Sequence, residues 1–284
     1  MNDILHRFIF QELDVRGQVI RLSDSCQQMI NNHQYPDFIK DLLIQSAAIN
    51  ALLAATLKFE GKISLQLQSK SGLKSMLVQT NNQLQYRGLV HFDDSADFSN
   101  ISFQQIAQNG QMVITIVPNQ GKRYQGIVPM NGNSLAECIE YYFAQSEQLN
   151  TRLKLFCKNN QVIGVMLQAL PEMKQKENFE HLDYLLQTLE AEEAFEIDHD
   201  TLMMRLFHQE SLSNLMEQNV SFNCDCSREK MLDAVLLLDV DEIADSLSRD
   251  GEIAVTCEFC LSSFSFSDVD LKKHQSITGN QTKH

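Results

Sequence analysis

Apolar and polar positions alternate along much of the first 170 residues, a pattern typical of strands with one buried face. Turn-forming pairs such as Ser71-Gly72 and Asn81-Asn82 separate the central runs, so we expect these runs to form an antiparallel meander. The earliest run is expected to break at Arg16-Gly17. The runs predicted to be strands are residues 8–22, 63–67, 76–78, 84–86, 112–117 and 162–169.

Two longer segments of the same region predict helices. Residues 37–59 are apolar and rich in Ala and Leu, which favours a buried helix. Gly61 is expected to end that helix, because glycine commonly follows a helix C-terminus. Ser134 has capping-box spacing to a glutamate three residues on, so a second helix should run to Leu149. Strands and helices together predict a mixed α+β core domain over residues 1–171.

The character of the chain changes after Pro171. Residues 172–218 are highly charged, lack Gly and Pro, and keep apolar residues at helical spacing. We therefore expect residues 172–222 to form a charged helical linker. Such acidic helices depend mostly on tertiary packing, so two arrangements remain open: helices packed on the core, or a connector that can detach and expose its apolar stripes. The stripes are Leu182, Leu185, Leu186 and Leu189, and then Leu202, Leu206 and Phe207.

The most specific pattern lies near the C-terminus. It reads Cys224-Asp-Cys226, then thirty residues, then Cys257-Glu-Phe-Cys260. Two close pairs of thiolates, with enough chain between them to fold back, meet the requirements of a tetrahedral zinc site. Residues 223–284 are thus expected to form a small α+β module that binds one Zn²⁺ per chain.

The residues around the cysteines favour such a module. Ser227 can cap a helix that runs to about Leu238, and residues 241–247 continue helically. Short strands are expected at residues 252–256 and 262–267, on either side of the Cys-x-x-Cys turn, after a turn at Asp250-Gly251. Phe264 and Phe266 would share one face of the second strand.

The distribution of charge along the chain argues against one class of function. Of the net −14, residues 1–170 contribute +1 (14 basic, 13 acidic), residues 171–220 contribute −9 (3 and 12), and residues 221–275 contribute −7 (5 and 12). This acidity argues against a zinc-ribbon nucleic-acid-binding protein, since such binding depends on Lys and Arg. No apolar run approaches the roughly 18 residues that span a membrane, and no secretory signal is recognisable, so we expect a cytoplasmic protein.

Zinc in so small a module need not be only structural. Metal binding supplies on the order of 10–16 kcal/mol of folding free energy in such modules, and thiolates are the form that oxidants attack. The site would thus couple oxidation to unfolding. Two cysteines one residue apart would form a small, strained disulfide that is easily reduced, which suits a reversible sensor. A purely structural zinc site remains the alternative.

The chain resembles the heat-shock protein thirty-three family of redox-regulated holdase chaperones. Besides the cysteine pattern, Tyr124-Gln-Gly-Ile-Val128 and Tyr142-Phe-Ala-Gln-Ser-Glu-Gln-Leu149, with Thr151 following, look like that family's core-domain signatures. The order of parts also agrees, and the likeness covers nearly the whole chain. Asn150 stands where the family pattern has proline, which should alter a turn rather than the chemistry.

The resemblance implies a mechanism. Cys224, Cys226, Cys257 and Cys260 would bind zinc when reduced. On oxidation Cys224 would pair with Cys226 and Cys257 with Cys260, the metal would leave, and the module and linker would lose order. The exposed apolar surface would hold unfolded or oxidised client proteins without ATP, and the active form would be a homodimer.

Three further cysteines lie outside this pattern. Cys138 matches another family cysteine and is a candidate accessory thiol, although a buried helix residue is the alternative interpretation. Cys26 and Cys157 are interpreted as ordinary small apolar residues.

Other functional classes find less support. A thiol oxidoreductase using Cys257 and Cys260 would need a thioredoxin-like strand–motif–helix setting, and one metal would occupy all four thiols. An enzyme core with a structural zinc tail remains conceivable, but the sequence contains no Walker loop, His-Glu-x-x-His or Gly-x-Ser-x-Gly motif. We expect a chaperone that is not an enzyme and binds neither nucleic acid nor membrane.

Overall fold

The computed structural model describes residues 3–57, 60–108, 110–171 and 173–273. The chain divides into two compact units, Met1–Asn223 and Cys224–His284. Both units mix helices with strands, which confirms the predicted α+β class. Within the described ranges, no helix combines the length and apolar character that crossing a membrane requires.

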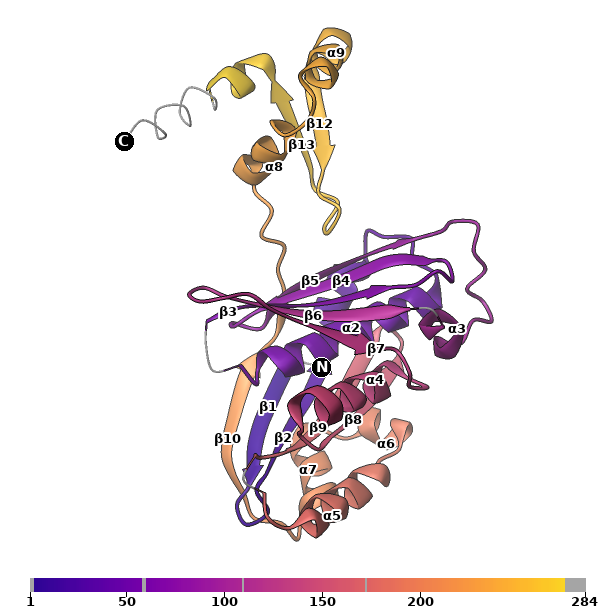
Figure 1. Cartoon of the computed structure of the whole chain (residues 1–284), viewed down its shortest axis with the longest axis vertical. Coiled ribbons are helices and arrows are strands. Elements are labelled where there is room, and N and C mark those ends of the chain that lie inside the picture. The colour runs from indigo at the N-terminus through magenta and orange to yellow at the C-terminus, as the bar shows by residue number, and fades with distance from the viewer. Residues whose placement is uncertain (1–2, 58–59, 109, 172, 274–284) are drawn as a thin grey trace. The chain divides into compact units, whose positions relative to one another are not determined.

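Two sheets build the first unit (Figure 1). Sheet A has the strand order β10-β1-β2-β9-β8, and sheet B has the order β11-β5-β4-β3-β6-β7. Antiparallel pairing of β3, β4 and β5 confirms the predicted meander. Sheet A comprises β1 (Ile4–Phe10), β2 (Val15–Leu22), β8 (Thr151–Lys158), β9 (Gln161–Ala169) and β10 (Leu212–Asn219). Sheet B comprises β3 (Gly61–Gln68), β4 (Leu73–Asn81), β5 (Gln85–Phe92), β6 (Gln111–Pro118), β7 (Tyr124–Pro129) and β11 (Ser221–Phe222).

The main core surrounds helix α2 (Asp37–Ala54), which packs against strands of both sheets. Thirteen of its 18 residues are buried, including every residue from Ser46 to Ala54, which explains why the second half of the helix is almost entirely apolar. Its one buried amide, Asn50, donates from Nδ2 to Thr80 Oγ1 (2.8 Å) and to the Ile63 carbonyl (3.2 Å). Helices α1 (Asp24–Ile30), α3 (Phe103–Ala107) and α4 (Leu135–Tyr142) complete this core.

A second core forms where three helices pack on sheet A. Helices α5 (Lys176–Gln187), α6 (Ala191–Glu196) and α7 (His199–Phe207) place their apolar side chains against Phe8, Val165 and Leu167. Both stripes predicted from sequence take part, with Leu185 only partly buried. Of the two arrangements considered for this segment, the structure has the packed one.

The C-terminal unit is small. It contains α8 (Arg228–Val235), α9 (Val240–Asp250) and the antiparallel pair β12 (Glu252–Thr256) and β13 (Ser263–Ser267), as the sequence predicted with minor changes at the ends. Gly251 ends α9 with φ of 75°, a left-handed conformation that glycine adopts without strain. Among its described residues, the apolar core of this unit consists of Leu232, Val235, Ile253, Phe266 and Leu271, beside the buried Cys257.

Several predicted boundaries were wrong. The break near the N-terminus falls between Phe10 and Val15, and Gly17 lies inside β2, where a Cβ would come within 2.1 Å of the Phe8 ring. Helix α2 ends at Ala54, where the N–H groups of Thr56 and Leu57 donate to the carbonyls three residues back (3.0 and 3.1 Å) in a tighter closing turn. Of the predicted helix, residues 58–59 lie outside the described residues, and Gly61, expected to end it, is instead the first residue of β3.

Later segments also depart from the prediction. The helix that Ser134 caps was predicted to run to Leu149, but its α-helical part, α4, ends at Tyr142. A π-helical turn, η1 (Phe143–Glu147), follows and stops at Gln148, which has a φ of 56°. Residues 212–222 are not helical: β10 pairs with β1, whose backbone groups would otherwise form a free sheet edge. Strand β8 was not predicted, although Leu153 and Leu155 alternate with Arg152 and Lys154 in the period-2 pattern of a half-buried strand.

Candidate metal centre

Four cysteine sulfurs meet in the C-terminal unit. The Sγ atoms of Cys224, Cys226, Cys257 and Cys260 all lie within 4.8 Å of one another. The Cys224–Cys257 and Cys226–Cys260 sulfur pairs are 3.6 and 3.5 Å apart. Four sulfurs at about 2.3 Å from a tetrahedral zinc would be about 3.8 Å apart. The cluster therefore has the donor set and approximate dimensions of a four-thiolate metal site and could hold a metal ion.

Each half of the cluster is fixed by local hydrogen bonds. Cys257 and Cys260 lie on the turn between β12 and β13, where the Cys257 N–H donates to the Ser262 carbonyl (2.9 Å). The first pair directly precedes α8, and Ser227 caps this helix by accepting from the Lys230 N–H (3.2 Å). Lys230 Nζ in turn donates to the Asp225 carbonyl (2.7 Å), which holds the Cys-x-Cys loop.

The thiols of the cluster differ in acidity. Burial raises the pKa of Cys224 and Cys226. Burial also acts to raise the pKa of Cys260, but hydrogen bonds with Ser262 and with the neighbouring thiols outweigh it and lower that pKa to about 7. A thiol that ionises near neutral pH offers a first ligand to a cation, whose charge then favours the thiolate form of the others.

The other three cysteines lie in the first unit. Cys26 is buried near the Tyr86 hydroxyl (3.6 Å), and burial raises its pKa to about 12. Cys138 is fully buried in α4, and burial raises its pKa as well. For Cys157, burial and the adjacent Asp41 carboxylate (3.4 Å) raise the pKa. All three thiols are therefore protonated at neutral pH. The sequence had not indicated that a carboxylate lies beside Cys157.

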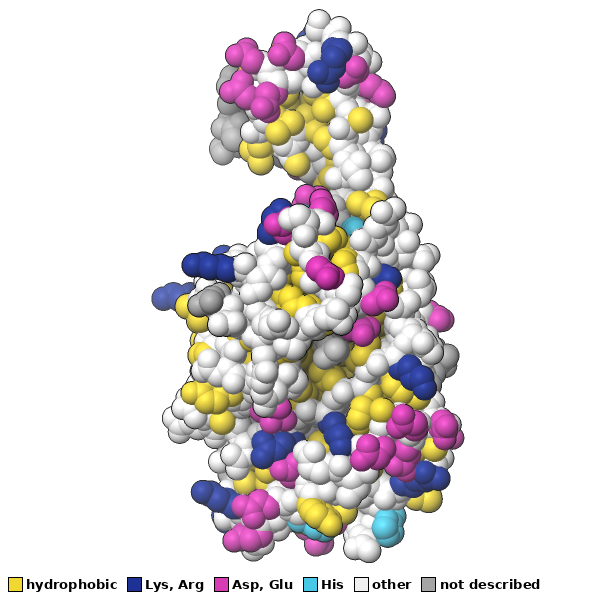
Figure 2. Space-filling view, turned by 90° about the vertical axis from the view of Figure 1, so that its right-hand side faces the viewer, with side chains coloured by type: hydrophobic (Ala, Val, Ile, Leu, Met, Phe, Trp, Pro, Cys, Tyr) yellow, Lys and Arg dark blue, Asp and Glu magenta, His cyan; other side chains and the backbone are white. Residues whose placement is uncertain are grey.

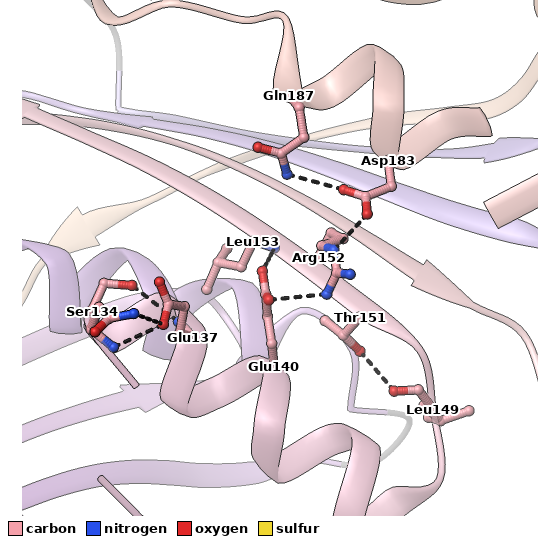
Figure 3. Close-up of polar contacts among 10 residues, drawn as sticks. Ser134, Glu137, Glu140, Leu149, Thr151, Arg152, Leu153, Asp183 and Gln187 are labelled. Atoms are coloured by element: carbon pink, nitrogen blue, oxygen red, sulfur yellow. Dashed lines mark hydrogen bonds and ion pairs between the residues drawn. The ribbon is translucent and has the colours of Figure 1, made fainter. Parts of the chain in front are cut away.

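A charged junction fastens the helical segment to the core. Arg152 on β8 binds Asp183 of α5 through Nε (2.7 Å) and Glu140 of α4 through Nη1 (3.2 Å), as Figure 3 shows. Glu140 also accepts from the backbone N–H of Leu153 (2.7 Å). Lys154 Nζ adds a bond to the Gln187 carbonyl near the end of α5 (2.8 Å). Sequence reasoning missed this junction, because its bonded members are 12 to 33 residues apart.

A histidine pair lies at the start of α7. The rings of His6 on β1 and His199 are stacked with centroids 3.5 Å apart. Burial lowers the pKa of both histidines, and Arg21 adds to both shifts. The pKa of His199 falls to about 4, with a further contribution from the facing His6 ring. Both rings are therefore neutral at pH 7, and one ring nitrogen, His199 Nδ1, is buried without a hydrogen-bond partner.

Fold and cluster together define an α+β protein of two units, the smaller of which carries a four-cysteine site of the metal-binding type. The chain belongs to the Hsp33 protein family, whose family model matches residues 3–267. The resemblance seen in the sequence is thereby confirmed.

Curated relatives carry the name 33 kDa chaperonin. The protein of Shewanella loihica is 41% identical over 271 residues, covering 95% of this chain and 94% of its own length. That of Pseudoalteromonas translucida is 39% identical over 276 residues, covering 95% and 98%. A crystal structure of the 33 kDa chaperonin of Thermotoga maritima superposes with a TM-score of 0.85 over 99% of this chain and 100% of that one. At 19% identity this likeness shows the shared fold.

Proposed function

We propose that this protein is a redox-regulated, ATP-independent molecular chaperone, a holdase that keeps unfolded and oxidatively damaged proteins from aggregating. It would be inactive when reduced and zinc-bound. The observation that carries the proposal is the gathering of four sulfurs in a unit with only five buried apolar residues among those described. Membership of a family whose relatives are named chaperonins supports the chaperone class.

Zinc would be the main source of stability for the C-terminal unit. Five large apolar side chains form only a small core, and units of this size commonly need a metal or disulfides for stability. A bound zinc would add on the order of 10–16 kcal/mol. Removing the ligands from the metal should therefore unfold this unit.

Oxidation would remove those ligands. Each disulfide forms when one peroxide takes two electrons from two thiols and leaves as two waters, so two peroxides convert the four thiols into two disulfides. We propose the pairs Cys224 with Cys226 and Cys257 with Cys260, as in the related family. A disulfide sulfur no longer carries the thiolate charge that binds Zn²⁺, so the metal leaves.

Unfolding of the C-terminal unit would spread to the segments that precede it directly in the chain. Strand β11 ends at Phe222, two residues before Cys224, and β10 precedes it directly. Loss of order after residue 224 would loosen these strands and then α5–α7, whose apolar faces and the sheet surface beneath them are buried together. Exposed, these surfaces would bind the apolar segments of unfolded clients and favour a homodimer, since large apolar patches are typical of interaction sites.

The competing functions gain no support from the surface or from the cysteines. On the face drawn in Figure 2, acidic side chains outnumber basic ones on the C-terminal unit, contrary to the needs of a nucleic-acid binder. All four thiols of that unit belong to one cluster, which leaves no separate nucleophile there for a thiol oxidoreductase. We therefore expect no catalytic turnover, and propose that the protein works in the cytoplasm.

An aggregation assay tests the proposal. A model protein is heated without ATP beside the reduced, zinc-loaded chain or the same chain after peroxide treatment, and light scattering is recorded. We expect only the peroxide-treated protein to suppress aggregation. This activity should be lost when the treated protein is reduced with a dithiol and supplied with zinc. Equal activity of both forms would contradict redox control. Inactivity of both would contradict the chaperone function.

A further inference from the structure

A cavity of about 410 Å³ opens on sheet A beside the C-terminal end of α2, within the first unit. Its walls are mostly apolar and include Ile9, Leu170 and Met216. Its polar lining side chains are Arg7 of β1 and Arg16 and Gln18 of β2. A cavity of this size with apolar walls and a few convergent polar groups has the character of a small-molecule site. It is unrelated to the cysteine cluster.

The two arginines lie on the same face of sheet A. Arg7 pairs directly with Gln18 across the strands, and Arg16 pairs with Ile9, so the arginines are diagonal neighbours on that face. Such neighbours have Cα atoms about 7–8 Å apart, within reach of long side chains. Their guanidinium groups bond to the strands on either side, Arg7 to Met216 of β10 and Arg16 to Gln168 of β9.

The observed partners of both arginines are uncharged. Arg7 donates to the Ala55 carbonyl (3.1 Å) and to Met216 Sδ (3.7 Å), while Arg16 donates from Nε to Gln168 Oε1 (3.0 Å). Neither arginine takes part in an ion pair within the described part of the chain. Burial lowers the pKa of Arg16, with no carboxylate to offset it.

Unsatisfied polar atoms also line the cavity. Gln18 is 2% exposed, and its buried Oε1 has no hydrogen-bond partner. Arg7 Nε, opposite it, is likewise buried and unpaired. An unsatisfied buried polar group costs free energy, and more when it is charged. A carboxylate in the cavity would accept a hydrogen bond from Arg7 Nε and remove that part of the cost, whereas the Gln18 oxygen is itself an acceptor and needs a donor.

We propose that this cavity binds a small organic monocarboxylate with a hydrocarbon body. Guanidinium groups match a carboxylate because their planar N–H donors can bind both of its oxygens. The apolar walls suit a short alkyl chain and give an inorganic anion nothing to contact. Since Met216 belongs to β10, the bound ligand would contact three adjacent strands of sheet A.

Calorimetric titration of the full-length, reduced, zinc-loaded protein tests the proposal, with octanoate below its micelle concentration as probe. We expect saturable binding of one octanoate per chain, at least tenfold weaker binding of the uncharged 1-octanol, and no comparable binding of inorganic phosphate. Hydrogen exchange should slow in β1, β2 and β10 when octanoate is present.

Variants separate the site from non-specific adsorption. Arg16→Leu should weaken octanoate binding at least tenfold. Arg16→Lys keeps the charge and should weaken binding less, which would show that the loss in Arg16→Leu does not come from misfolding. Arg123→Leu, at an exposed arginine outside the cavity, should bind as the parent does. Absence of octanoate binding, equal affinity for octanol or phosphate, or equal loss in the Arg123 and Arg16 variants would each overturn the proposal. None of these outcomes bears on the aggregation assay.

Discussion

At the scale of single residues, the seven cysteines fall into two chemical groups. Four share one site in the C-terminal unit, where neighbouring sulfurs and Ser262 hydrogen bonds adjust their acidity. The remaining three are separated from that site, and burial raises the pKa of each. Thiolate is both the metal-binding and the oxidant-sensitive form, so metal binding and redox chemistry should belong to the first group alone.

Substitution of one cluster cysteine should abolish metal retention. For Cys226→Ser we expect zinc affinity to fall by more than about 100-fold, because even changes outside the ligand set cost 10- to 100-fold. Metal content after gel filtration against a competing chelator measures the effect. Cys157→Ser is the matched control and should keep one zinc per chain. Equal metal content in the two variants would contradict the assignment of the site.

The cysteine site could be predicted from sequence because its information is local. Spacing alone singled out the four cysteines whose sulfurs lie together in the structure, and the Ser227 cap and the strands around the Cys-x-x-Cys turn follow from neighbouring residues. The Arg152 junction and the Cys157–Asp41 contact could not be predicted, because they join elements distant in sequence. Long-range pairs of this kind depend on the register of strands, which no short motif encodes.

At the scale of elements, the retention of α5–α7 on sheet A is the central question. Their apolar faces form the second core, and the junction at Arg152 adds directed bonds to α5. The charged, amphipathic composition of this segment correctly predicted helices at residues 176–207. It wrongly predicted helix for β10, which is a strand because it pairs with β1. Tertiary pairing there overrides local helical preference.

Asp183→Asn should loosen α5. The Arg152–Asp183 pair is partly exposed, so its loss should cost only about 0.5–1 kcal/mol and speed local opening roughly two- to fivefold. Hydrogen exchange of residues 176–187 measures this directly, with the exposed Asp37→Asn as control. If the function proposed above is correct, peroxide activation should also be faster in Asp183→Asn. Unchanged exchange in α5 would show that the junction does not hold the helix.

The stacked histidines make the attachment of α7 pH-dependent. Because the folded protein holds the pKa of His6 and His199 below the usual value of about 6.5, the neutral forms stabilise the packed state. This contribution is complete above that value and is lost as pH falls toward 4, where His199 titrates. The charged groups that face the pair are Arg21, Asp198, Asp200 and Glu217.

Hydrogen exchange of residues 199–207 should therefore accelerate between pH 7 and pH 5, after correction for the intrinsic rate. His199→Phe keeps the stacking on His6 but cannot be charged, so the variant should lose most of this pH dependence. Helix α2, whose buried residues do not titrate in this range, serves as the internal reference. Identical pH dependence in the variant and the parent would exclude the pair as the cause.

At the scale of the whole molecule, the two units differ in what stabilises them. The first has two extensive apolar cores, whereas the described part of the second has an apolar core of five residues and a four-sulfur site. We therefore expect metal loss to unfold Cys224–His284 and to loosen β10 and β11, while the other strands of both sheets stay folded. The acidic surface of the segments after residue 170 adds self-repulsion that favours release once the metal has gone.

The central claim is that oxidation, zinc release, detachment of α5–α7 and client holding are one linked event. The most direct measurement treats the reduced, zinc-loaded chain with peroxide at mildly elevated temperature. Zinc release, thiol content, hydrogen exchange of residues 176–219 and suppression of aggregation are followed in the same sample. The account predicts that one zinc per chain leaves with four thiols as these amides lose protection and holding activity appears. Zinc that stays bound, or that leaves while α5–α7 remain protected and no activity is gained, would contradict it.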